Sequence, residues 1–310
     1  MVEYQEGTPS PAARRDGGGS ARVAREKSRL RRKLSAELRG MRPDGWTQAQ
    51  VATKLHWSES KLGRIESGMV AVSATDLMAL LKAYGRDDEA TVERLVAMGK
   101  IARHQHWSRY RDVHSAAFIR YLGFEAEAGT IQSFQPQVMH GLLQTPGYAW
   151  ALLTSSGANL VPEAQAKRMV EGRLERSSML ELPDGPRFDL IMDESVIRRR
   201  VGGRKVMLEQ LQHVLSMSER PEISIRLLPL ETDIYTGAWE AFTVLGFEDG
   251  EVVLYLEDGS STVFPASGRG GPADPYLTAF ARMQEAAASV DQSRVMVQDA
   301  VRRLSDSSKE

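Results

Sequence analysis

The chain has 310 residues, of which 42% are hydrophobic and 26% are charged, and it contains no cysteine. This length suits two domains with a core each, and the absence of cysteine excludes disulfide bonds, thiolate metal sites and cysteine nucleophiles. No apolar run is long enough to span a bilayer, and the N-terminus lacks the apolar segment of a secretion signal. We therefore expect a soluble cytoplasmic protein.

The net charge of −1 conceals an uneven distribution of charge along the chain. Residues 1–104 contain 19 Lys and Arg against 13 Asp and Glu, whereas residues 105–310 contain 21 against 28. A basic segment joined to an acidic remainder is typical of an attached nucleic-acid-binding module. A lone basic run is more often the solvated face of a helix. This run, however, directly precedes two short helical patterns in residues 47–68, which favours the nucleic-acid interpretation.

The first third of the chain predicts a tail followed by an all-α domain of five helices. Residues 1–27 are rich in Gly, Pro, Ser and charge, which predicts a flexible basic tail. Residues 28–104 form the helical domain, whose first helix begins at Ser28 and ends before Pro43 and Gly45. Its other four helices are predicted at residues 47–55, 58–66, 73–84 and 88–103.

Residues 47–66 predict a helix-turn-helix, which explains why two helices too short to be stable alone follow each other. Each helix buries the other's apolar face, and Ala52 is small enough to let them cross closely. The predicted shared core consists of Val51, Leu55, Leu62 and Ile65. His56 stands in the turn where Gly is usual, because a left-handed backbone is common there, and histidine is among the less penalised substitutes. Such a motif presents its second helix to the major groove of DNA.

Candidate DNA contacts lie in the first turns of the second helix of the motif, away from its apolar face. Arg64 is the best candidate for a base, through two hydrogen bonds to guanine O6 and N7. The predicted DNA-binding set is Gln48, Ser58, Glu59, Ser60, Lys61 and Arg64, with further phosphate contacts from Arg29, Arg32 and Lys33. Glu59 and Lys61 are equally well explained as ordinary surface residues. Glu66 is predicted to close the motif through an internal salt bridge.

The remainder predicts a connecting helix at residues 105–130, a mixed α/β (α+β) domain at 131–304 and a short tail at 305–310. Strands are predicted at residues 130–136, 187–195, 222–230, 240–247 and 251–257. Helices are predicted at residues 145–153, 162–182, 205–219, 275–290 and 291–304. Asp-Gly pairs in residues 248–261 indicate a hairpin within a meander.

No catalytic, metal or cofactor site is predicted, and an enzyme is disfavoured. His104, His106 and His114 lack the spacing of a metal site and are expected at the surface or between domains. The segment "DESVIRRR" (193–200) is interpreted as a strand end with solvated charges, or else as a patch that binds an acidic group. The aromatic residues of "IYTGAWEAF" (234–242) are expected in the core, with a pocket or an interface as the alternative.

Two families resemble this sequence. "GWTQAQVATKL" followed by "SKLGRIESG" resembles the XRE-type helix-turn-helix of phage repressor and Cro relatives. The second half is similar to the C-terminal domain of the actinobacterial WhiJ-like and antitoxin-like XRE regulators, on "HGLLQTPGYA" (140–149), "ESVIRRRVGG" (194–203), "VMLEQLQHVL" (206–215) and "ISIRLLPL" (223–230). His140 stands where that group usually has proline. The resemblance implies a transcription regulator, often encoded beside a small partner protein that tunes it.

The sequence therefore favours a nucleoid-associated, DNA-binding transcription regulator that acts as a homodimer on a two-fold symmetric operator. Its C-terminal domain is expected to bind a small regulatory protein, in the manner of the antitoxin-like group. The alternative is a one-component regulator whose C-terminal domain senses a small molecule. An enzyme with a DNA-targeting module is the least favoured interpretation.

Overall fold

The computed structural model describes residues 11–103, 106–155, 161–233, 240–257, 262–265 and 271–306. Contacts divide the chain into a helical unit, Val23–Arg109, and a second unit formed by Met1–Arg22 and Tyr110–Glu310. The second unit contains a six-stranded mixed sheet with helices, so the predicted fold class is confirmed. In the described part of the chain, no helix is both long enough and apolar enough to cross a membrane.

The first helix, α1, runs from Pro11 to Met41. The prediction of a flexible tail over residues 1–27 is therefore wrong for residues 11–27, and the helix begins well before Ser28. Composition misled here because Gly17–Gly19 and the surrounding charges favour disorder. Ala21 and Ala24 are 2% and 1% exposed, and their burial together with the high helix propensity of alanine supports the extra turns.

The rest of the helical unit follows the prediction closely. Its helices are α2 (Gln48–Leu55), α3 (Glu59–Glu66), α4 (Ala74–Ala83) and α5 (Glu89–Arg103). Their buried side chains form one core: Leu34, Leu38, Val51, Ala52, Leu62, Ile65, Val72, Leu77, Leu80, Leu81, Tyr84 and Leu95. The predicted connecting helix at 105–130 is instead two elements, η1 (His106–Tyr110) and α6 (Ala116–Glu127). The hydroxyl of Ser115 caps α6 by accepting from Phe118 N at 3.1 Å, so a new helix starts there.

The strands and helices of the second unit alternate before β4. The strands are β1 (Thr130–Gln135), β2 (Arg187–Asp193), β3 (Ile223–Leu228), β4 (Phe242–Gly246), β5 (Val252–Leu256) and β6 (Thr262–Pro265). The other elements are η2 (Gly141–Leu143), α7 (Pro146–Ser155), α8 (Glu163–Ser177), η3 (Ser178–Glu181), α9 (Ser195–Arg198), α10 (Arg204–Met217), α11 (Asp274–Ala286) and α12 (Val290–Asp306).

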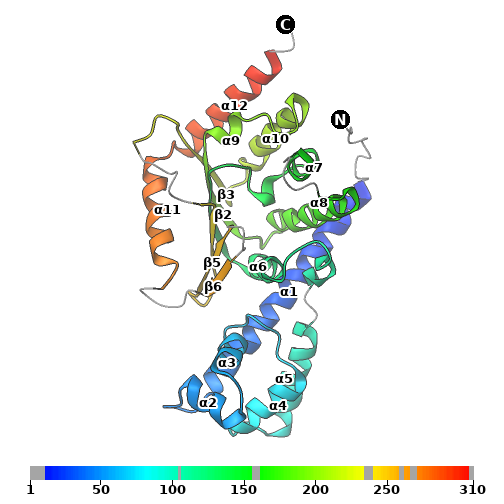
Figure 1. Ribbon diagram of the computed structural model, residues 1–310, viewed down its shortest axis with the longest axis vertical. Helices are drawn as coiled ribbons and strands as arrows, with labels where there is room; N and C mark the ends of the chain where they lie inside the picture. The colour runs from blue at the N-terminus through cyan, green and yellow to red at the C-terminus, as the bar shows by residue number, and fades with distance from the viewer. Residues whose placement is uncertain are drawn as a thin grey trace. The chain divides into compact units, whose positions relative to one another are not determined.

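The strand order in the sheet is β3-β2-β1-β4-β5-β6. β1, β2 and β3 are parallel neighbours, whereas β4, β5 and β6 continue the sheet as an antiparallel meander from the other side of β1. Helix α11 covers one face of the sheet, and α6, α7, α8 and α10 lie on the other (Figure 1). The predicted hairpin is confirmed as β4 and β5, with Gly250 at φ 77° in the turn between them.

Two short elements differ from the prediction. Strand β6 was not predicted, since its four residues are too few to show alternation. Residues Ser195–Arg198 are one helical turn, α9, rather than the end of a strand, because Asp193 Oδ1 accepts a hydrogen bond from Ser195 N at 2.9 Å and turns the chain. Of the segment "IYTGAWEAF", Phe242 lies in the core at 0% exposure as predicted, while Tyr235 and Trp239 lie outside the described residues.

Buried polar side chains hold the helices to one another on the face opposite α11. Gln210 of α10 is fully buried, and its amide accepts from Thr145 N and donates to Leu143 O, both at 2.7 Å. This glutamine links two of the segments that carry the family resemblance, 140–149 and 206–215. The side-chain oxygen and nitrogen of Gln210 each have a hydrogen-bond partner, so burying this amide leaves neither atom unpaired, which would cost free energy.

A buried ion pair lies between α6 and α8. Arg176 Nε is 2.7 Å from Glu125 Oε2, with side chains 6% and 0% exposed. Tyr121 OH donates to Glu125 Oε1 at 2.5 Å and its ring stacks on Tyr255 of β5, with centroids 3.9 Å apart. A Cβ on Gly141 would lie 2.7 Å from Arg176 Nη2, so only glycine leaves room for the guanidinium.

Two histidines beside this pair are held neutral. Burial, reinforced by Arg176, lowers the pKa of His140 well below its usual value. Burial, reinforced by Arg173 and Arg176, lowers the pKa of His114 to about 4, although Asp112 opposes the shift. The unfolded chain protonates histidine near pH 6.5, so the stability linked to neutral His114 is complete above that pH and is lost as pH falls from about 6.5 toward 4, and that linked to His140 is lost in the same direction.

We predict that His114→Gln reduces the loss of stability on acidification. The melting temperatures of wild type and variant should be compared at pH 8 and at pH 5. The pH 8 difference measures the packing change alone, and the additional difference at pH 5 measures proton uptake by the unfolded histidine. An equal drop in melting temperature for both proteins would show that His114 takes no part in the acid sensitivity.

Candidate nucleic-acid interface

The turn between α2 and α3 has the geometry that the sequence predicted. His56 adopts φ 54° and ψ 37°, and it is the only non-glycine residue with positive φ in the described part of the chain. Its N–H donates to Thr53 O at 3.1 Å, and Trp57 N–H donates to Ala52 O at 2.8 Å. These bonds use carbonyls left open at the end of α2, so the left-handed residue both ends α2 and directs the chain into α3.

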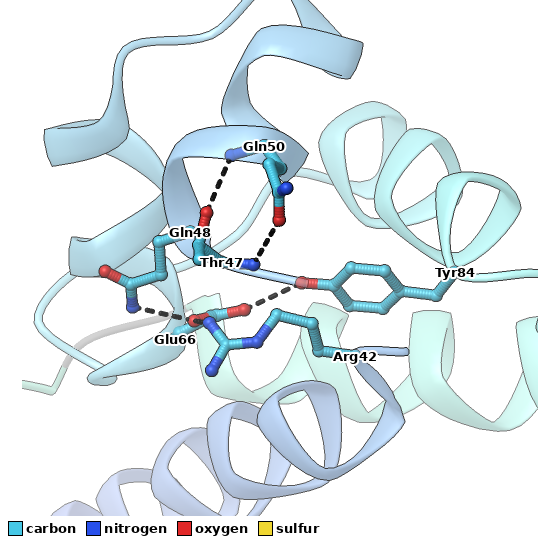
Figure 2. Close-up of polar contacts among 6 residues, drawn as sticks. All are labelled: Arg42, Thr47, Gln48, Gln50, Glu66 and Tyr84. Carbon is cyan, nitrogen blue, oxygen red and sulfur yellow. Dashed lines mark hydrogen bonds and ion pairs between the residues drawn. The ribbon is translucent and has the colours of Figure 1, made fainter. Parts of the chain in front are cut away.

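Both helices of the motif are capped by their own sequences. Thr47 Oγ1 accepts from Gln50 N at 3.2 Å, and Gln50 Oε1 accepts from Thr47 N at 2.8 Å, a reciprocal capping box (Figure 2). Ser58 Oγ accepts from Lys61 N at 3.2 Å. The predicted DNA-binding residue Ser58 is therefore the N-cap of α3.

One buried carboxylate joins the helices of the motif. Glu66, with a side chain 0% exposed, accepts from Arg42 Nη1 at 3.0 Å, from Gln48 Nε2 at 2.8 Å and from Tyr84 OH at 2.7 Å (Figure 2). Burial, together with the hydrogen bond to the Glu66 carboxylate, raises the pKa of Tyr84, so its hydroxyl remains a donor. The predicted internal salt bridge of Glu66 is confirmed by its contact with Arg42.

Two predicted DNA-binding residues have a structural partner. The side-chain nitrogen of Gln48 donates one hydrogen bond to Glu66, which leaves its second N–H and its carbonyl oxygen for other partners. Lys61 Nζ pairs with Asp76 Oδ1 of α4 at 2.7 Å and lies over the ring of Trp57, 3.9 Å from the centroid. Gln48 was predicted at the start of the first helix of the motif and Lys61 in the second, but their partners lie in other elements and gave no local signal.

The remaining predicted residues of α3 are exposed together. Ser60 and Arg64 lie one turn apart on the solvent side of the helix, and Glu59, next to Ser60 in the chain, is exposed as well. Arg64 Nε donates to Ser60 O at 3.1 Å, and no acidic side chain of the described residues pairs with Arg64. None of these three side chains pairs with an opposite charge among the residues that the structure describes, so α3 presents a cation, a hydroxyl and a carboxylate to the surroundings.

The basic residues expected to contact phosphate lie on α1. Arg29 and Lys33 are exposed and Arg32 is half-buried. A Cβ on Gly68, which follows α3 at φ 70°, would lie 3.9 Å from Arg32 Cα and 3.4 Å from Ser35 Oγ. The backbone of α1 at Arg32 therefore passes beside Gly68, just after the C-terminal end of α3.

Comparison with known families agrees with this geometry. Residues 18–95 match the model of a helix-turn-helix domain, and the chain is a helix-turn-helix DNA-binding protein, a class that serves transcription regulation. Residues 118–299 match the domain of unknown function DUF5753, and the chain belongs to that family. The search of the curated proteins and the search of the solved structures each gave no significant match to this chain.

We predict that Glu66→Ala destabilises the helical unit by roughly 3 kcal/mol, because Tyr84 and Arg42 lose the partner of their buried polar atoms. Urea unfolding of the full chain should be combined with hydrogen exchange over residues 47–84, which assigns the loss to this unit. Glu59→Ala is the matched control, and its exposed position keeps its effect within about 0.5 kcal/mol. Equal exchange rates in the two variants would contradict the structural role of Glu66.

Proposed function

We propose that this protein is a sequence-specific transcription regulator of the XRE type that binds its operator through α3. The observation that carries the proposal is the exposed set Glu59, Ser60 and Arg64 on a helix whose other face is fixed by the Glu66 contacts. A guanidinium at this position suits the O6 and N7 acceptors of guanine, the commonest specific contact in the major groove. Arg29, Arg32 and Lys33 would supply phosphate contacts and salt dependence.

The regulator acts as a homodimer on a two-fold symmetric operator. One recognition helix makes only a few base contacts, which is too little for useful selectivity in a genome. Two copies related by a two-fold axis double the contacts and require half-sites about one helical turn apart, centre to centre. Binding to DNA places the protein in the nucleoid.

The C-terminal domain regulates this activity by binding a small protein and is not catalytic. Support comes from the resemblance of segments 140–149, 194–203 and 206–215 to the WhiJ-like and antitoxin-like group. A small-molecule sensor is the second interpretation, and the experiment below separates the two.

We predict that Arg64→Ala weakens operator preference by about 10- to 100-fold, because one bidentate base contact contributes about 1–3 kcal/mol of discrimination. Binding to operator and to scrambled DNA should be measured at several salt concentrations. Arg86→Ala is the matched control, since Arg86 is an exposed arginine of the same unit that lies after α4. Circular dichroism should be unchanged in both variants. Unaltered discrimination in Arg64→Ala would remove this residue from the reading surface.

We predict tight, salt-sensitive binding of the full chain to the DNA upstream of its own gene, measured by fluorescence anisotropy. Addition of the small protein encoded next to the gene should alter the affinity. If that protein leaves the DNA affinity unchanged, small ligands are favoured as effectors. Such ligands would be identified by the rise that they cause in the melting temperature of the full chain. Absence of binding at moderate salt would refute the assignment of α3 as a recognition helix.

A further inference from the structure

A pocket of about 200 Å³ lies in the C-terminal unit among α9, α10 and α12. Its apolar lining includes Ile197, Met207 and Leu304, which are 4%, 0% and 8% exposed. Its polar lining includes Glu194, Arg198 and Arg200. The pocket thus combines a buried apolar floor with arginines of the segment 193–200.

The pocket lies beside the carboxyl ends of two parallel strands. Glu194 directly follows β2, and Leu230 lies two residues beyond β3, its neighbour in the parallel part of the sheet. Leu230 N–H donates to Glu194 Oε2 at 3.0 Å, which places the two strand ends side by side. Glu194 therefore lines the pocket and holds the segment that follows β3 beside it.

The charge of the lining is unbalanced toward the positive. Both acidic lining residues are already paired: Glu194 with Arg198, and Asp299 with Arg302. Arg198 Nε lies 2.7 Å from Glu194 Oε1, which holds that guanidinium along the wall. Arg200 is exposed and makes no ion pair with any described residue. An incoming carboxylate therefore meets an arginine with no competing acid.

Exposed apolar side chains flank the same pocket. The two large hydrophobic residues of this unit that are more than half exposed, among those the structure describes, are Leu230 at 57% and Val295 at 52%. Leu230 adjoins Glu194 through the hydrogen bond above, and Val295 lies one helical turn before the lining residue Asp299 on α12. These two side chains offer apolar surface near the pocket for a bound segment to cover.

The size of the pocket selects the kind of occupant. Pockets for drug-sized ligands measure roughly 300–1,000 Å³, whereas the volume here is about 200 Å³. That space suits one large apolar side chain, and the rim outside it suits an adjoining carboxylate. We propose that the pocket among α9, α10 and α12 binds an acidic peptide segment of a partner protein, with one apolar side chain inserted against Met207 and Leu304 and a neighbouring Asp or Glu on Arg200.

This assignment rests on the proposed partner-controlled function and names where the partner binds. It is tested by selecting random dodecapeptides displayed on phage against the full chain, then measuring the binding of fluorescein-labelled selected peptides by anisotropy. Selected peptides should pair Asp or Glu with Leu, Ile, Met or Phe, and their binding should weaken with salt.

Two variants test the pocket independently. Arg200→Glu reverses the charge of the rim, and Ala300→Phe fills the cavity, since Ala300 is a half-buried lining residue. Each should raise the peptide Kd by about tenfold or more. Arg282→Glu is the matched control, because Arg282 is an exposed arginine of α11 on the other face of the sheet. It should leave the Kd unchanged, and circular dichroism should show all three variants folded.

Three outcomes would overturn the assignment: no enrichment of acidic-apolar peptides, equal binding of the peptides by wild type and both pocket variants, or binding of 4-methylpentanoate as tight as that of any peptide. Operator binding measured on the same samples separates this inference from the proposed function. Loss of peptide selection with intact operator binding refutes the pocket alone. If the chain binds the peptides but does not bind operator DNA, the proposed function is refuted and the assignment of the pocket is retained.

Discussion

The helix-turn-helix depends on the requirement that a buried carboxylate be fully hydrogen-bonded. Glu66 receives donors from the loop after α1, from α2 and from α4, and each comes from a different part of the sequence. An ionised group without such donors would cost several kcal/mol in the interior. The packing of these elements is therefore specified by chemistry as well as by shape, and the outward orientation of Glu59, Ser60 and Arg64 on α3 follows from it.

The C-terminal domain also buries polar side chains between its helices. Gln210 and the Glu125–Arg176 pair connect helices across one face of the sheet, whereas the α11 face is apolar, with Phe134, Phe242 and Phe280 in its core. The parallel half of the sheet brings the ends of β2 and β3 to one edge. Because the chain turns directly into α9 after β2, this edge carries arginines beside an apolar floor.

Features encoded within a few residues were predictable from the sequence. The caps at Thr47 and Ser58, the left-handed His56 and five of the six strands all have short-range signals, and Glu66 was predicted to form an internal salt bridge. Contacts between distant segments were not predictable in this way. Two such contacts form only when α4 packs against α3. They are the ion pair of Lys61 with Asp76 and the hydrogen bond from the Tyr84 hydroxyl to Glu66. Residues 11–27 illustrate the opposite error, because composition favoured disorder where burial of Ala21 and Ala24 supports a helix.

The separation of the Glu66 contacts from the outward face of α3 has an evolutionary consequence. Substitutions at Glu59, Ser60 or Arg64 leave Arg42, Gln48 and Tyr84 bonded as before, so duplicated copies of such a gene can diverge in target DNA while their stability is preserved. The same separation makes α3 a practical site for retargeting. Residues on the outward side of this short helix can be substituted without loss of these contacts. Glu66, on the inward side, remains constrained by its hydrogen bonds to Arg42, Gln48 and Tyr84.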